Sequence, residues 1–310
     1  MPALGVASWL LSPLASSVRR VLSGTDDGRS DVVTRIEAPL GAPGWFTPDD
    51  AIWTVHGSVA TFLGGIRSLL MQTLHPLALA GVTRHSDYRQ DPFGRLQRTG
   101  AFIAATTYGP VAVAEQTVAA IGTMHGRVRG TLADGRGYSA QDPRLLEWVH
   151  VALVDSMLTA YLEFGHDGHI DPDSYVANMA VVGQAMGVVD PPTSVTGLRR
   201  SINGFRAELA GGPEADEMKS FIMAAPLPFA LQPGYGMLAR AAMDTLPDWT
   251  MVMLGQNPPP TPVRRARSVV ADSALRTLSV ALVRSPARAA GERRLAADRP
   301  QTMDRAVPVV

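Results

Sequence analysis

Apolar residues along most of the chain recur at the spacing of an α-helix. From Asp49 onward they fall at positions i, i+3, i+4 and i+7, which is the pattern of a helix that buries one face. We find no convincing run of the strict alternation that marks a half-buried strand. The pattern therefore predicts an all-α fold, with helices near residues 49–63, 65–80, 95–107, 110–128, 142–165, 172–187, 194–210, 214–224 and 234–245.

The longest of these helices is also the most uniformly apolar. It opens at Asp142-Pro143, where an N-cap residue precedes a proline suited to the first turn, and it runs to Gly165. Its apolar stripe is broad, so other helices can pack against it from several sides. We therefore predict a central, largely buried helix.

Composition divides the chain into three parts. Residues 1–46 are expected to hold an N-terminal helix and a connector rich in Gly, Pro and Asp, and residues 47–257 the helical domain. Residues 258–310 are expected to hold a proline-rich linker, a basic helix at 263–282 and a tail that is disordered after Ser285. Prolines interrupt the apolar segment 221–238, so it cannot be one helix. A lid over a cavity and an ordinary packed loop both fit it.

The composition narrows the classes of function. The 310 residues are 46% hydrophobic and 18% charged, which suits a folded protein rather than a disordered one. The formal charge is zero, whereas nucleic-acid binding normally needs an excess of Lys and Arg, so no nucleic-acid partner is expected. The absence of cysteine excludes disulfides, iron–sulfur clusters, thiolate haem ligation and covalently attached haem. A metal would have to bind His, Asp, Glu, Tyr or Met.

The terminal segments bear on the compartment. Residues 1–22 are interrupted by Pro13 and lack a basic leader, so they make a poor signal peptide. No stretch of about 20 apolar residues is free of proline and charge. Residues 264–305 carry ten arginines against four acidic residues, a surface that anionic lipid headgroups could attract. We expect a cytoplasmic protein, with peripheral membrane contact through the N- or C-terminal helix as an open alternative to simple solvation.

Two polar clusters in helix-patterned sequence carry the candidate chemistry. His125 and Arg129 are four residues apart and are expected to share one helix face. Arg95, Arg98 and Thr99, at positions i, i+3 and i+4, are expected to form a second face. Histidine is the favoured haem-iron ligand in a chain without cysteine, and guanidinium groups match the haem propionates. The spacing alone also fits a structural core histidine beside a surface arginine.

The same clusters give the chain a family resemblance. The segments Phe93-Gly94-Arg95-Leu96-Gln97-Arg98-Thr99 and Met124-His125-Gly126-Arg127-Val128-Arg129, followed by the long helix after Asp142-Pro143, resemble the MpaB-type and rubber-oxygenase (latex-clearing protein) superfamily. The resemblance covers roughly Ala51 to Val189. It implies a globin-like helical bundle around a non-covalent haem b, with activities that include oxidative cleavage of carbon–carbon double bonds in terpenoids or polyisoprene. It makes His125 the proximal iron ligand and matches Arg95, Thr99 and Arg129 to other haem-pocket residues. Arg98 falls where the rubber oxygenases have a basic residue.

The chain departs from the rubber oxygenases on the oxygen-binding side of the haem. Those enzymes resemble one another in an acidic residue upstream of the arginine motif, whereas this chain has no Glu between Ala51 and Arg95. We predict His75, late in an apolar helix, and His150, on the long helix, as candidate catalytic residues, because a neutral imidazole can hydrogen-bond dioxygen or accept a proton. A cap contact for His75 and a buried hydrogen bond for His150 are equally compatible structural roles.

A di-iron carboxylate site is the rival interpretation of the metal chemistry. Glu147-x-x-His150 and Glu163-x-x-His166 repeat a pair found in di-iron helical bundles. However, the two pairs start sixteen residues apart on what is predicted to be one helix, which separates them by about 24 Å. A shared centre would require a break in that helix, and residues 151–162 contain neither Pro nor Gly.

These features predict a haem b-dependent oxidoreductase that uses dioxygen on an apolar substrate of isoprenoid or lipid-like character. Its electron donor is left open by the sequence. A haem-binding sensor or carrier without turnover would need the same residues, and a helical scaffold at a membrane surface is a third class. The sequence shows no Gly-x-Ser-x-Gly nucleophile motif, P-loop or dinucleotide fingerprint, so hydrolases and nucleotide-dependent enzymes are not indicated.

Overall fold

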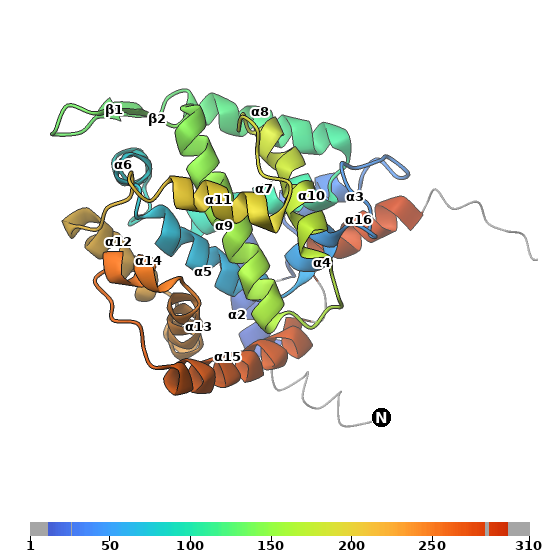
Figure 1. Cartoon of the computed structure of the whole chain (residues 1–310). Coiled ribbons are helices and arrows are strands. Elements are labelled where there is room, and N and C mark those ends of the chain that lie inside the picture. The colour runs from blue at the N-terminus through green and yellow to red at the C-terminus, as the bar shows by residue number, and fades with distance from the viewer. Residues whose placement is uncertain (1–11, 26, 283–284, 297–310) are drawn as a thin grey trace, which may run out of the picture.

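The computed structural model describes residues 12–25, 27–282 and 285–296. Helices dominate these residues, which include one short two-stranded sheet, so the predicted all-α class is confirmed (Figure 1). The elements are α2 (Ser12–Ser23), α3 (Asp31–Glu37), α4 (Ala51–Gly57), α5 (Ala60–Gln72), α6 (Pro76–His85), α7 (Pro92–Tyr108), α8 (Val111–His125), β1 (Arg129–Thr131), β2 (Gly137–Ser139), α9 (Pro143–Phe164), α10 (Pro172–Ala185), α11 (Val195–Gly204), α12 (Pro213–Met223), the 3₁₀ turn η1 (Phe229–Leu231), α13 (Gln232–Asp244), α14 (Asp248–Met253), α15 (Thr261–Leu282) and α16 (Pro286–Ala296).

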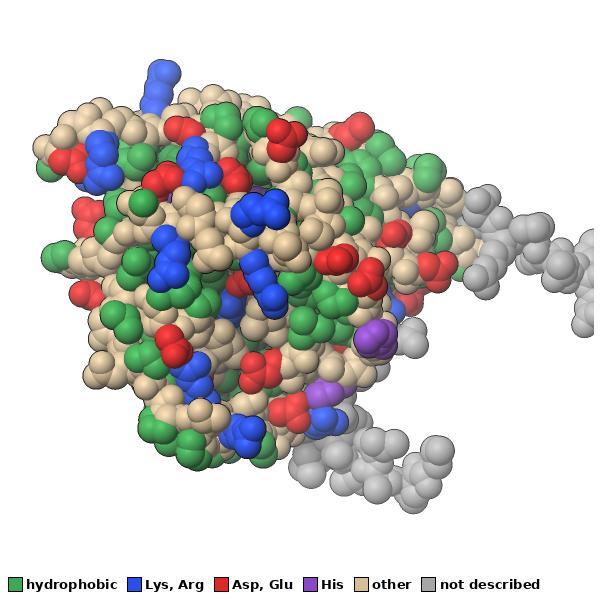
Figure 2. All heavy atoms as spheres, viewed as in Figure 1, with side chains coloured by type: hydrophobic (Ala, Val, Ile, Leu, Met, Phe, Trp, Pro, Cys, Tyr) green, Lys and Arg blue, Asp and Glu red, His purple; other side chains and the backbone are tan. Residues whose placement is uncertain are grey.

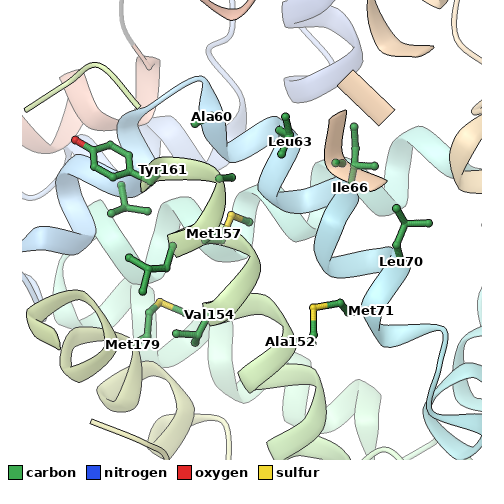
Figure 3. Close-up of a cluster of buried hydrophobic side chains, with 14 of the residues drawn as sticks. Ala60, Leu63, Ile66, Leu70, Met71, Ala152, Val154, Met157, Tyr161 and Met179 are labelled. Carbon is green, nitrogen blue, oxygen red and sulfur yellow. The ribbon is translucent and has the colours of Figure 1, made fainter. Parts of the chain in front are cut away.

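The centre of the fold is the pair α5 and α9. Helix α9 begins as predicted, with the Asp142 side chain accepting a hydrogen bond from the Arg144 amide at 2.8 Å and Pro143 in the first turn. It packs against α5, α10 and α11, and Figure 3 shows side chains of α5, α9 and α10 lying in one apolar cluster. Gly64 allows close approach of α5, because a Cβ there would lie 2.8 Å from the Met157 sulfur. The predicted central, buried helix is confirmed.

Length and apolar composition would also allow α9 to cross a membrane. It is the one helix of the described residues with that property, and 61% of its apolar window is buried inside the protein. The core helix of a soluble protein has the same character. On the face drawn in Figure 2, Lys and Arg side chains are interspersed with Asp and Glu, in keeping with a formal charge of zero.

The predicted helices at 49–63 and 65–80 are three shorter helices, α4, α5 and α6. The first break is at Ser58, whose backbone is extended and whose hydroxyl accepts a hydrogen bond from the Ala60 amide at 3.3 Å. The second is at His75, which is also extended because the residue before a proline avoids the helical region. His75 therefore caps α6 instead of lying late in the preceding helix.

Both terminal regions are more ordered than the composition predicts. The expected connector within residues 1–46 contains α3, whose Val33 and Ile36 are buried. The expectation of a disordered tail after Ser285 is wrong for residues 286–296, which form α16 and pack against α3 and α7. Tertiary contacts order this polar, arginine-rich helix, and the sequence pattern does not reveal them. The tail from 297 to 310 lies outside the described residues.

The predicted break in the segment 221–238 is confirmed. Helix α12 ends at Met223, and the chain continues through extended residues and η1 before α13 starts at Gln232. The pattern missed α14, which has six residues and is too short to show a helical period.

Candidate functional site

Helices α7 and α8 form a hairpin in which both predicted polar clusters lie away from the connecting turn. Only Gly109 and Pro110 separate the helices, and such a short connection makes them neighbours. Arg95 lies about 21 Å before this turn and His125 about 24 Å after it, at 1.5 Å per residue. In Figure 1, the C-terminal end of α8 leads directly into the β1–β2 hairpin. We call this end of the α7–α8 pair the open end, and the other the turn end.

Arg95 contributes an uncompensated positive charge at the open end. Its side chain is half-buried and donates a 2.7 Å hydrogen bond to the neutral Ser86 hydroxyl, and no carboxylate of the described residues pairs with it. Burial lowers the pKa of Arg95, and the nearby charge of Arg98 lowers it further. A bound anion would favour the charged guanidinium and so raise the pKa of Arg95 again.

The other two residues of this cluster already have partners. Arg98 is 65% exposed and forms an ion pair with Asp91 at 3.3 Å. The Thr99 hydroxyl donates to the Arg95 carbonyl at 3.1 Å, one turn back along α7. The expected helical placement of Arg95, Arg98 and Thr99 is confirmed. Of these three residues, Arg95 alone carries a charge without an ionic partner among the described residues.

His125 is the last residue of α8, and its side chain is half-buried. Its imidazole makes no hydrogen bond or ion pair with the residues that the structure describes. Burial lowers its pKa, because desolvation disfavours the charged ring. The imidazole is therefore neutral near pH 7, and neutral imidazole is the form that binds a metal.

The prediction that His125 and Arg129 share a helix face is wrong. Helix α8 ends at His125, and a tight turn follows in which the Val128 amide donates to the His125 carbonyl at 3.0 Å. Arg129 then starts β1, which pairs with β2 around the turn at Asp134-Gly135. Gly135 has a φ of 87°, which Asp-Gly hairpin turns require. The turn therefore joins two strands.

Two surface clefts border the open end. One, of about 530 Å³, is lined by Arg129 and residues of both strands. The other, of about 510 Å³, is lined by residues 83–90 and by α12, and includes the Ser86 that bonds Arg95. They adjoin where the His85 ring and the Tyr138 hydroxyl hydrogen-bond at 3.0 Å. Both clefts are open to solvent.

His75 lies apart from the hairpin, in the corner between α5 and α6. It is 2% exposed, stands beside Trp148 and Phe205, and neither ring nitrogen has a hydrogen-bond partner in the described residues. Its Nε2 is 3.6 Å from Oε2 of Glu208. The other carboxylate oxygen, Oε1, is bound by Arg144 at 2.6 Å. Burial lowers the pKa of His75, and the Glu208 charge opposes that shift. The result is a buried imidazole beside a partly exposed carboxylate.

His150 occupies a third location, at the contact between α9 and α10. Its ring packs on Gly183, where a Cβ would lie 2.8 Å from the ring. It is 7% exposed, its Nε2 has no partner in the described part of the chain, and burial lowers its pKa to about 4. The catalytic assignment of His75 and His150 stays a prediction, since the two rings lie on different elements from His125.

Sequence reasoning missed a fully buried histidine, His56. Its Nδ1 is 2.7 Å from the Thr107 hydroxyl of α7, and its Nε2 is 3.1 Å from the Tyr175 hydroxyl of α10. Burial lowers its pKa to about 3. Both nitrogens have partners, so His56 joins α4, α7 and α10 as a structural residue. A lone histidine in an apolar helix gave no signal of this network.

The geometry rules out one shared di-iron centre. Both Glu-x-x-His pairs belong to α9 or the residues just after it, and α9 is unbroken from Pro143 to Phe164. Glu147 bonds Ser201, Glu163 bonds Ser268, and His166 bonds Asp272. Within the described ranges, no group of three or more His, Asp or Glu side chains could hold a metal ion.

Comparison with known proteins identifies the family. No curated protein and no solved structure matches the chain significantly. A family model does match: residues 53–281 correspond to the catalytic domain described as ER-bound oxygenase mpaB/B'/Rubber oxygenase. The matched residues include α5 to α14, and with them the α7–α8 hairpin and the central helix α9. Because the match covers well over half of the 310 residues, the chain belongs to the mpaB/rubber oxygenase catalytic-domain family.

Proposed function

We propose that this family member is a haem b-dependent oxygenase that uses dioxygen on an apolar substrate of isoprenoid or lipid-like character. His125 is the proposed iron ligand, and Arg95, Arg98, Thr99 and Arg129 are the proposed propionate-binding residues. Two observations support the proposal: the imidazole of His125, at the end of α8, is unpartnered in the described residues, and the half-buried guanidinium of Arg95, on α7, has no counterion there. An oxygenase function is what the family indicates.

The residues at the open end fit a haem in charge and in polarity. Arg95, Arg98 and Arg129 could each pair with a propionate, with Arg98 already paired to Asp91 and with Asp87, Glu214, Glu217 and Asp142 also lining the two clefts. The hairpin also exposes apolar side chains near this end, since Leu96 of α7 is 42% exposed and Met124 of α8 is 52% exposed. An apolar macrocycle lying against them would remove that surface from water, at about 25 cal/mol per Å².

When bound, the haem would supply the dioxygen chemistry, and the protein would supply ligation, orientation and polarity. His125 can bind iron through a ring nitrogen without first losing a proton, since its lowered pKa keeps it neutral. Arg95 can fix a carboxylate in two-point geometry, because a guanidinium presents parallel N–H groups. These roles require only that α7 and α8 keep their relative position.

His75 is the proposed proton-handling residue of this function. Its Nε2 lies 3.6 Å from the Glu208 carboxylate, whose side chain is 39% exposed and so links the buried ring to the surface. The surrounding Trp148 and Phe205 exclude water from the ring. No carboxylate forms an ion pair with His150 in the described residues, and we rank it second.

The test is turnover by the haem-loaded protein. Protein reconstituted with haem b is incubated with a reductant, oxygen and a panel of isoprenoids and unsaturated lipids, and oxygenated products are sought by mass spectrometry. The proposal expects products that contain oxygen from labelled dioxygen. Intact haem binding with every substrate unchanged would instead indicate a sensor or carrier. His75→Gln should lower the turnover number while leaving the haem spectrum intact.

A further inference from the structure

Helix α8 is little covered beyond the turn, whereas α7 packs against α2, α3, α4 and α16. Every residue of α8 is described, and of these only Val113 and Ala114, in the first turn, are buried. At the turn itself, Pro110 forms an isolated bridge with Gly44, and the Val111 amide donates to the Pro43 carbonyl at 3.0 Å. Helix α8 is therefore held mainly from the turn end, while α7 is also held by α2, whose Val21 carbonyl accepts a hydrogen bond from Gln97 at 3.1 Å.

Arg294 of α16 lies at the centre of that attachment. Its side chain is 0% exposed, and one Nη donates to the Tyr108 carbonyl at 2.7 Å while the other donates to the Ala42 carbonyl. Tyr108 is the last residue of α7, so its carbonyl is one of four that no helical amide can satisfy. Arg294 thus caps α7 from a segment 186 residues away along the chain.

The fit around this guanidinium leaves no room for a methyl group. A Cβ on Gly44 would lie 2.7 Å from the Gly109 carbonyl oxygen and 3.4 Å from Nη2 of Arg294. A Cβ on Gly291 would lie 2.9 Å from the Trp53 ring and 3.0 Å from the Tyr108 carbonyl oxygen. The Gly41 amide also donates to the Arg294 carbonyl at 2.8 Å. Three distant chain segments therefore meet closely at the turn.

The charge of Arg294 indicates more than packing. Arginine is almost never fully buried unless it is paired, and in the described residues its partners are carbonyl oxygens and not a carboxylate. The C-terminal end of α7 supplies a partial negative charge of about half a unit, which compensates part of the desolvation cost. An apolar side chain would fill the same space without that cost, but it could not bond both carbonyls.

We propose that α16 belongs to the functional unit although it lies beyond the family-matched residues 53–281, and that Arg294 is a positioning residue for the α7–α8 hairpin. By tying Tyr108 to Ala42, it fixes the direction in which α7 and α8 leave the turn, and so the spacing of Arg95 and His125 at the open end. The contacts of Arg294 hold the hairpin whether or not haem binds. The expected effect of Arg294 on haem binding rests on the proposed function.

The test compares three variants of the full chain. Arg294→Met removes the charge, Arg294→Lys keeps a cation that can still reach a carbonyl, and Arg293→Met is the matched control. Arg293 is the adjacent residue of α16, is 51% exposed and bonds Glu37 on the surface. Amide hydrogen exchange is measured without haem across residues 105–125, with α5 and α9 as internal references.

We expect Arg294→Met to speed exchange in the hairpin by roughly tenfold or more, because a buried charge-assisted hydrogen bond is lost. Arg294→Lys should restore part of the protection, and Arg293→Met should match the wild type. Unchanged exchange in the hairpin, or equal acceleration in α5 and α9, overturns the proposal. If Arg294→Met does not fold, Gly44→Ala is the second variant, since its methyl group would push against the same turn.

Haem titration separates this inference from the proposed function. Faster hairpin exchange together with a weakened histidine-ligated haem spectrum in Arg294→Met, but not in Arg293→Met, supports both. Faster hairpin exchange when neither the wild type nor any variant binds haem supports the anchor and contradicts the haem assignment. Full haem affinity and an unaltered spectrum in a variant with a loosened hairpin contradict the positioning role.

Discussion

Replacing Arg95 by methionine should weaken haem binding far more than replacing Arg98 in the same way. Arg95 is half-buried and has only the neutral Ser86 hydroxyl as a side-chain partner in the described residues, so its charge is free for a propionate. A hydrogen bond to a charged group is worth about 1.5–3 kcal/mol, which is about 10- to 150-fold in Kd. Arg98 is 65% exposed and shared with Asp91, so its loss should cost at most about 1 kcal/mol, or fivefold.

The assay is titration of the haem-free protein with haem, followed by the Soret absorbance, at low and at high salt. Methionine keeps the apolar stem of both side chains, so the pair of variants compares the two charges directly. The contribution of Arg98 should also fall with salt, because exposed charges are screened. Equal losses in the two variants, or a larger loss for Arg98→Met, would refute the reasoning from burial and pairing.

Further predictions concern stability and membrane contact. Burial keeps His56 and His150 neutral in the folded state, with pKa values of about 3 and about 4, whereas the unfolded chain protonates both below about pH 6.5. Each histidine should therefore lower the free energy of unfolding by about 2 kcal/mol between pH 7 and pH 5. Urea unfolding at both pH values measures this change. The free energy of unfolding should fall less over this pH range in His150→Leu than in the exposed control His169→Asn. Gly183→Ala should lower stability by about 1–3 kcal/mol because the added Cβ would meet the His150 ring. Gly100→Ala has open space around it and should stabilise α7 by about 0.5–1 kcal/mol. A higher melting temperature for Gly183→Ala than for Gly100→Ala would contradict this packing. On α15, Val269 and Val270 are 66% and 53% exposed, and the paired change to Asp should abolish co-sedimentation with anionic vesicles. Equal sedimentation of the variant and the wild type would contradict a membrane contact through α15.

The pattern of apolar residues predicted the elements whose signal is local. Helix α9 has a cap, a proline in its first turn and an uninterrupted apolar stripe, and its start agrees within a residue. The break between α4 and α5 depends on one serine hydroxyl, and α16 depends on contacts with residues 41–44 and 108. Such tertiary contacts outweigh local propensity, and periodicity does not record them.

The sequence predicted which residues could form the candidate site better than it predicted how they are arranged. The i, i+3, i+4 spacing correctly placed Arg95, Arg98 and Thr99 on one helix. The same reasoning failed for Arg129, because the Asp-Gly turn five and six residues after it closes a β-hairpin, and the helix ends at His125. The sequence also could not reveal that Arg95 lacks a counterion, since that depends on which side chains surround it.

The central claim is tested most directly by the absorbance spectrum of haem-reconstituted protein with and without the His125 side chain. The wild type and the surface control His169→Ala should each bind one haem per chain with the spectrum of histidine-ligated iron. His125→Ala should lose that spectrum and regain it on addition of free imidazole, which can occupy the vacated space. A His125→Ala protein whose spectrum and haem affinity equal those of the wild type would contradict the assignment of His125 as the iron ligand.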